Sequence, residues 1–92
     1  MIVRILSEGQ FQLPDNVAER LNELDNEAVA AVEEGDEQRF RELFGEMLDL
    51  VTSGGSPVPD EELLESQVII PPRDLSFDEA QAEFTGDGLI PD

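Results

Sequence analysis

The chain has 92 residues, of which 23 are Asp or Glu and only 5 are Lys or Arg, so its formal net charge is -18. This length suffices for one domain, spanning residues 1–92, with one modest core. The absence of Cys excludes disulfides and thiolate chemistry. No apolar run approaches the roughly 18 residues that span a bilayer, and no secretory signal segment begins the chain, so we expect a cytoplasmic location.

The acidity permits three interpretations: a nucleic-acid mimic, a disordered acidic tail, or adaptation to a salt-rich cytoplasm. The acidic residues are spread over every segment, and the apolar residues are periodic, which disfavours a disordered tail. All five basic residues are arginines. A nucleic-acid mimic needs a charged face, and this need does not explain a chain without lysine. At about 1 M salt the Debye length falls to about 3 Å, so the repulsion among the acidic side chains largely disappears. The composition therefore favours a halophilic, archaeal source.

Two short apolar runs open the chain and predict strands over about 2–6 and 10–13. They flank Glu8-Gly9, a turn signal, so we expect a β-hairpin. A single hairpin is marginal alone and needs a surface to pack on.

Two predicted helices, each with an apolar stripe, provide that surface. Asp15 is the predicted N-cap of a helix over about 16–33, which continues through Asp25 without a phase shift. Asp36 is the predicted N-cap of a second helix, which ends near residue 52. The connection around Gly35 is very short, so the two helices should form an antiparallel hairpin.

The last third predicts shorter elements. Residues 53–59 are expected to be a linker, 60–64 a single helical turn and 68–70 a buried strand. Ser76 and Glu79 match a capping box before a helix over about 77–84. The predicted fold is a compact α+β domain. A small sheet, made of the hairpin and one later strand, packs on the helix hairpin and a short C-terminal helix.

The chain offers little for catalysis, because it has no His, Cys, Lys, Tyr or Trp and no phosphate-binding glycine motif. We expect neither an enzyme nor a cofactor. Two acidic clusters could suggest a cation site, but a helix junction and a first helical turn explain them more simply. These clusters are Glu33, Glu34, Asp36 and Glu37, and then Asp60, Glu61 and Glu62.

Two apolar features are candidates for binding a protein partner. One is the stretch around Pro57 and Pro59, and the other is the tail with Leu89, Ile90 and Pro91. The simpler explanation of the first is a rigid linker, and that of the second is docking on the domain's own core. Surplus apolar surface could also serve a homodimer. Nucleic acid is an improbable ligand, because no basic patch is present.

The order of the segments resembles the phage-shock-protein-A-associated (PspAA) family. The resemblance covers the whole chain and rests on the segments MIVRIL, EGQFQLPD, LNELDNEAVAAVEEGDEQRF, SGGSPVPDEELLESQVIIPP and GDGLIPD.

This resemblance implies association with PspA, a long coiled-coil protein of the envelope stress response, and no catalytic residues. It points to an adaptor that meets the inner face of the membrane only through its partner. The alternative is an acidic, antitoxin-like regulator that mimics nucleic acid and binds a basic protein.

Overall fold

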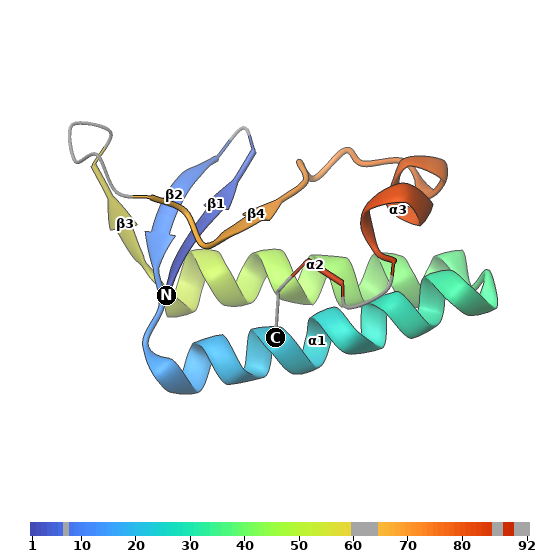
Figure 1. The fold of residues 1–92 in the computed structure, drawn as a ribbon, viewed down its shortest axis with the longest axis horizontal. Coiled ribbons are helices and arrows are strands. Elements are labelled where there is room, and N and C mark those ends of the chain that lie inside the picture. Colours follow the sequence, from blue (N-terminus) through green and yellow to red (C-terminus); the bar gives the residue numbers. More distant parts are fainter. Residues whose placement is uncertain (7, 60–64, 86–87, 90–92) are drawn as a thin grey trace.

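The computed structural model describes residues 1–6, 8–59, 65–85 and 88–89 and has the predicted α+β architecture. A sheet lies above a pair of long helices, and a short third helix packs beside the sheet (Figure 1). The elements in chain order are β1 (Ile2–Ile5), β2 (Gly9–Gln12), α1 (Asp15–Glu34), α2 (Glu37–Gly54), β3 (Ser56–Val58), β4 (Val68–Ile70) and α3 (Phe77–Glu83).

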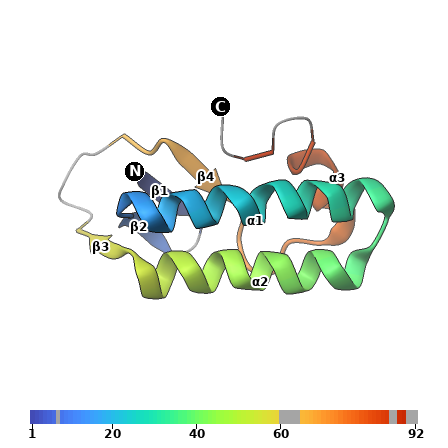
Figure 2. The same ribbon diagram turned by 90° about the horizontal axis from the view of Figure 1, so that it is seen from below.

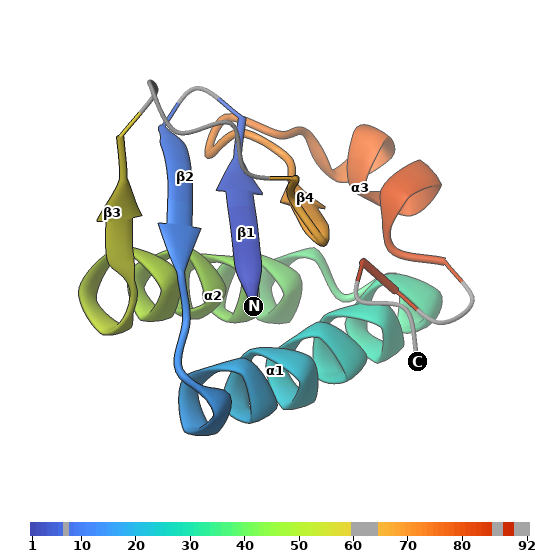
Figure 3. The same cartoon turned by 60° about the vertical axis from the view of Figure 1, so that its left-hand side comes forward.

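The sheet has four strands in the order β3-β2-β1-β4 (Figure 3). β1 pairs antiparallel with β2, which confirms the hairpin, and parallel with β4. Successive strand residues point to opposite faces. Val3 and Ile5 are accordingly buried in the core, whereas Arg4 and Leu6 are exposed on the other face, which we call the open face.

The two long helices run side by side and antiparallel, as predicted (Figure 2). Gly35 ends α1 in the left-handed conformation, at φ 72°, which glycine adopts without steric cost. The Asp36 carboxylate then accepts a hydrogen bond from the backbone N–H of Arg39 at 3.1 Å, which confirms its capping role. The hairpin thus forms because a helix stop and a helix start are adjacent in the sequence.

The start of α1 differs from the prediction. Pro14, rather than Asp15, is the N-cap residue, and no side chain caps this helix end. Asp15 is instead the first helical residue. Its negative charge still lies near the positive end of the helix dipole, so its stabilising role is electrostatic.

The linker predicted over 53–59 is wrong in two respects. α2 continues to Gly54, and Ser56–Val58 forms the edge strand β3, antiparallel to β2. Proline lacks an N–H, but an edge strand tolerates it because one side of the strand has no neighbour. Pro57 therefore fits opposite Phe11. The helical turn predicted over 60–64 lies outside the described residues.

The chain between β3 and β4 must cross from one edge of the sheet to the other. Ser66 lies over the open face, where its hydroxyl oxygen accepts a hydrogen bond from Nε2 of Gln10 at 2.6 Å. Gln10 is only 7% exposed although it points away from the helices. Ser66 therefore covers part of the open face near β2, whereas Leu6 and Ile69 are exposed.

Candidate partner-binding surface

The charges are unevenly distributed over the fold. None of the residues in the four described strands is Asp or Glu, although the chain carries 23 acidic residues. The strands contribute one charged side chain to the open face, that of Arg4. Among the described residues, Arg4 has no ion-pair partner. The open face is thus a weakly charged surface on a strongly acidic protein.

A groove of about 560 Å³ lies where this face meets α3. We call it the β4–α3 groove. Ile69 and Leu6 line one side, with exposed fractions of 54% and 45%, and they are the large apolar side chains most exposed among the described residues. The remaining lining residues are Pro71, Pro72, Leu75, Glu79, Ala82 and Glu83. The groove is apolar at its base and acidic along its α3 rim.

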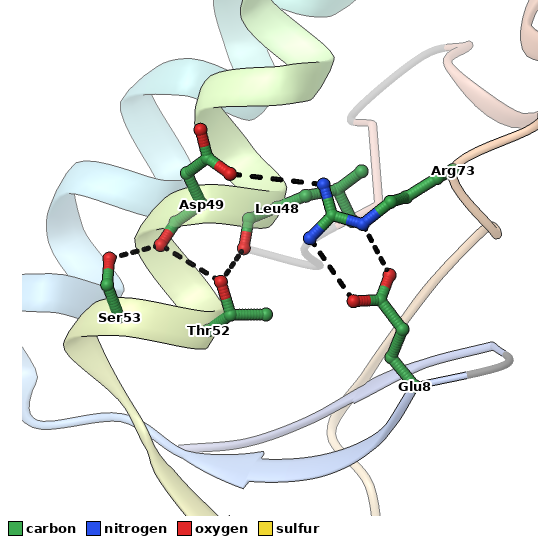
Figure 4. Close-up of polar contacts among 6 residues, drawn as sticks. All are labelled: Glu8, Leu48, Asp49, Thr52, Ser53 and Arg73. Atoms are coloured by element: carbon green, nitrogen blue, oxygen red, sulfur yellow. Dashed lines mark hydrogen bonds and ion pairs between the residues drawn. The ribbon is translucent and has the colours of Figure 1, made fainter.

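The end of the groove, residues 71–75, is fixed by two arginines. Arg73 binds both carboxylate oxygens of Glu8, at 2.9 and 3.2 Å, and lies 3.9 Å from the Asp49 carboxylate on α2 (Figure 4). Arg41 of α2 donates to the backbone carbonyl of Leu75. These contacts join the β-hairpin turn, α2 and the loop before α3. The groove is therefore bounded by a loop with three separate attachments.

The α3 wall of the groove begins with the predicted capping box. The N–H of Glu79 donates to the Ser76 hydroxyl at 3.1 Å, and the N–H of Ser76 donates to the Glu79 carboxylate at 3.2 Å. Hydrogen bonds from Ser76 lower the pKa of Glu79 below its usual value. The backbone of Ser76 has the larger effect, and its side chain has the smaller one. Glu79 is therefore charged at neutral pH and contributes to the acidic rim.

Aromatic packing holds α3 against α2. The Phe84 ring, fully buried, meets the Phe40 ring edge to face at 5.0 Å and the Phe44 ring at 6.0 Å. Phe77 makes a third edge contact with Phe40 at 6.0 Å. Such pairs add about 0.5–1.5 kcal/mol each beyond burial of area. This cluster sets the position of the α3 wall relative to the sheet.

A buried carboxylate fixes the segment that follows α3. Asp25 of α1 has no exposed surface, and its Oδ1 accepts a hydrogen bond from the backbone N–H of Leu89 at 3.0 Å. Gly88 lies directly over this carboxylate, where a Cβ atom would be 2.6 Å from Oδ2. The sequence pattern predicts that the helix continues through Asp25, but no interior role was assigned to this residue. Its position on the buried stripe, four residues after Leu21 and three before Ala28, was the signal for an interior role.

The predicted partner-binding residues do not come together. Pro57 and Pro59 are exposed at the β3 edge of the sheet. Leu89 lies near the opposite edge, half-buried against the core, and lines a second hollow beside Ser66 and Ile69. Ile90 and Pro91 lie outside the described residues. A role for any of them in partner binding stays a prediction.

The acidic clusters show no cation geometry in the part of the chain that the structure describes. There, no three acidic side chains are placed to hold a metal ion. Glu33, Glu34, Asp36 and Glu37 occupy the helix junction, where Asp36 serves as a cap. Asp60, Glu61 and Glu62 lie outside the described residues. Across the same described ranges, no helix has the length and apolar character to cross a membrane.

Comparison with known proteins gives one positive result. The family model described as "PspA-Associated protein" (PspAA) matches residues 1–92, the whole chain. No curated protein matches the sequence, and no solved structure matches the fold.

Proposed function

Because the chain belongs to the PspA-associated protein family, we propose that it is a non-enzymatic adaptor that binds a PspA-type coiled coil in the envelope stress response. The observation that carries this proposal is the family match over residues 1–92. The family's name implies association with PspA. Direct binding to the coiled coil of PspA is our proposal.

The surface of the molecule supports a binding role. The β4–α3 groove offers exposed apolar side chains, Leu6 and Ile69, beside a weakly charged sheet face. Exposed apolar residues that adjoin a groove are typical of protein-binding sites. The sequence contains no His, Cys, Lys, Tyr or Trp, which leaves few side chains suited to nucleophilic or general-base catalysis. Both observations favour an adaptor over an enzyme.

The charge of the chain bears on where it acts. A net charge of -18 disfavours direct contact with anionic lipid. We propose a cytoplasmic location, with any recruitment to the inner face of the membrane through its partner.

Affinity capture tests the proposal. The tagged protein is incubated with lysate of its own host at roughly 2 M KCl, where non-specific charge attraction is screened, and bound proteins are identified by mass spectrometry. Specific recovery of a PspA-type coiled coil, reproduced with the two purified proteins, is the expected result. If the same capture at low salt recovers a basic nucleic-acid-binding protein that is lost as salt rises, this would favour the alternative of a nucleic-acid mimic, which the net charge of -18 also suggests.

A further inference from the structure

We propose that the β4–α3 groove is the docking site for one amphipathic helix of the partner, with basic residues on the flank of that helix that faces α3. This inference rests on the proposed function and deepens it, because it names the surface and the chemistry of the contact. Leu6 and Ile69 provide the exposed apolar surface, and Pro71, Leu75 and Ala82 complete the base of the groove.

The chemistry of the β4 edge favours a helix over an added strand. An extended partner segment binds a sheet edge mainly through backbone hydrogen bonds. β4 has three residues and is followed at once by Pro71 and Pro72, neither of which has an N–H to donate. An added strand would therefore find few hydrogen-bond partners. A helix needs none of them, since it binds through its side chains.

The charges around the groove specify the flanks of that helix. Glu79 and Glu83 form the α3 rim, and neither has an ion-pair partner among the described residues. Arg4 lies on the sheet side, where it is in register with Ile69. The groove thus complements a helix with an apolar stripe, basic residues facing α3 and an acidic residue facing Arg4. Helices of coiled coils carry flanking charges of this kind beside their apolar seam.

A second copy of the chain is the less suitable occupant. Each copy carries a net charge of -18, which opposes self-association. In a symmetric dimer the same acidic rim would also be present on both partners. The groove is therefore better matched to a partner with basic residues.

The first test compares two substitutions on the same sheet. Ile69→Arg places a positive charge in the groove, and Gln12→Arg makes the same change at an exposed site on β2, two strands from β4. Affinity is measured with the purified PspA-type protein of the same genome, and melting temperatures confirm folding. We expect Ile69→Arg to weaken binding by about tenfold or more, as for a central interface residue, and Gln12→Arg to leave it unchanged.

The outcomes separate the two proposals. If the unmodified chain does not bind the PspA-type protein, the proposed function fails. If it binds, and both folded variants bind equally well, the function stands and the groove is the wrong surface.

The second test identifies the occupant. The chain has no Cys, so Ile69→Cys provides a unique thiol for a photo-reactive maleimide. Cross-links to partner residues spaced three and four apart are expected for a docked helix. Cross-links to every second partner residue would indicate an added strand, and cross-links to another copy of this chain would indicate a dimer. Either result would overturn the helix assignment.

Charge reversal tests the orientation. Glu83→Lys should weaken binding to the unmodified partner. The same variant should regain affinity for a partner in which the cross-linked basic residue is changed to Glu. Glu33→Lys, at an exposed site on α1 that does not line the groove, is the matched control and should have little effect. Equal effects of the two reversals would show that only net charge matters and would contradict the predicted flank.

Discussion

The backbone N–H of Leu89 donates to Oδ1 of Asp25 at 3.0 Å, so a side chain in the middle of α1 holds the chain near its C-terminal end. Asp25 is fully buried, and Leu89 packs partly against the core above it. A buried carboxylate is stable only if hydrogen bonds replace its lost hydration. The contact therefore joins the position of the segment after α3 to the integrity of α1.

Replacing Asp25 with Ala should destabilise the protein by about 1–3 kcal/mol, because a buried donor loses its acceptor. Asp25→Asn should cost less, since the amide oxygen can still accept from Leu89. Urea unfolding monitored by circular dichroism measures both. Unchanged stability in the Ala variant would mean that water replaces the carboxylate without cost.

Gly88→Ala should be more destabilising than Gly35→Ala. Both glycines have positive φ, 84° and 72°, so each substitution carries a left-handed strain of about 1–2 kcal/mol. Only at position 88 would the new Cβ meet the Asp25 carboxylate, at 2.6 Å, whereas position 35 is open. Thermal unfolding of the two variants compares them, and equal losses would contradict the close contact.

The capping box should make stability depend on pH. Its hydrogen bonds lower the pKa of Glu79 in the folded state, so the folded protein binds that proton less readily than the unfolded chain does. The resulting stabilisation is present above the usual pKa of Glu, about 4.3, and is lost as pH falls through the lowered value. The advantage of the wild type over Glu79→Gln should thus be largest near neutral pH and disappear in acid. A carboxyl titration followed by NMR should give Glu79 a lower pKa than exposed glutamates, and a normal value would contradict the box.

Added KCl should raise the melting temperature. The net charge of -18 makes the folded state self-repulsive, and the Debye length shrinks from about 10 Å at 0.1 M to about 3 Å at 1 M salt. Each kcal/mol of relieved repulsion corresponds to about 4–8 °C for a domain of this size. The described ion pairs lie at the surface and lose little on screening.

A charge-reduced variant is the control for that experiment. Changing Glu33, Glu34 and Glu37 to Gln removes three exposed charges at the helix junction and should reduce the salt dependence. A melting temperature that falls with salt in the wild type would contradict the repulsion argument and, with it, the halophilic interpretation of the composition.

Local patterns predicted most of the secondary structure. The hairpin strands, both long helices, β4 and α3 are confirmed because each has an apolar period and a nearby stop signal. Gly35, Asp36 and the Ser76–Glu79 pair act over three or four residues, so their roles can be deduced from adjacent sequence. Such signals do not depend on the rest of the fold.

Features that depend on distant partners were not predicted. β3 contains Pro57 and has strand geometry only because β2 lies beside it. Asp25 in the core accepts a hydrogen bond from Leu89, which is 64 positions away in the sequence. The β4–α3 groove brings Leu6 together with residues 69–83, and no pattern within any one segment indicates that meeting.

The place of β1 in the sheet has a consequence for synthesis of the chain. β1 is translated before β2, β3 and β4, yet it lies between β2 and β4, and the N–H of Leu6 donates to the carbonyl of Ile70. Until that residue is translated, β1 has an unpaired edge, while the β1–β2 hairpin and both long helices can already be complete. Before β4 is made, the nascent protein has β1, β2 and β3 only, and a chain released before residue 68 would expose to aggregation the edge of β1, whose one charged side chain is Arg4.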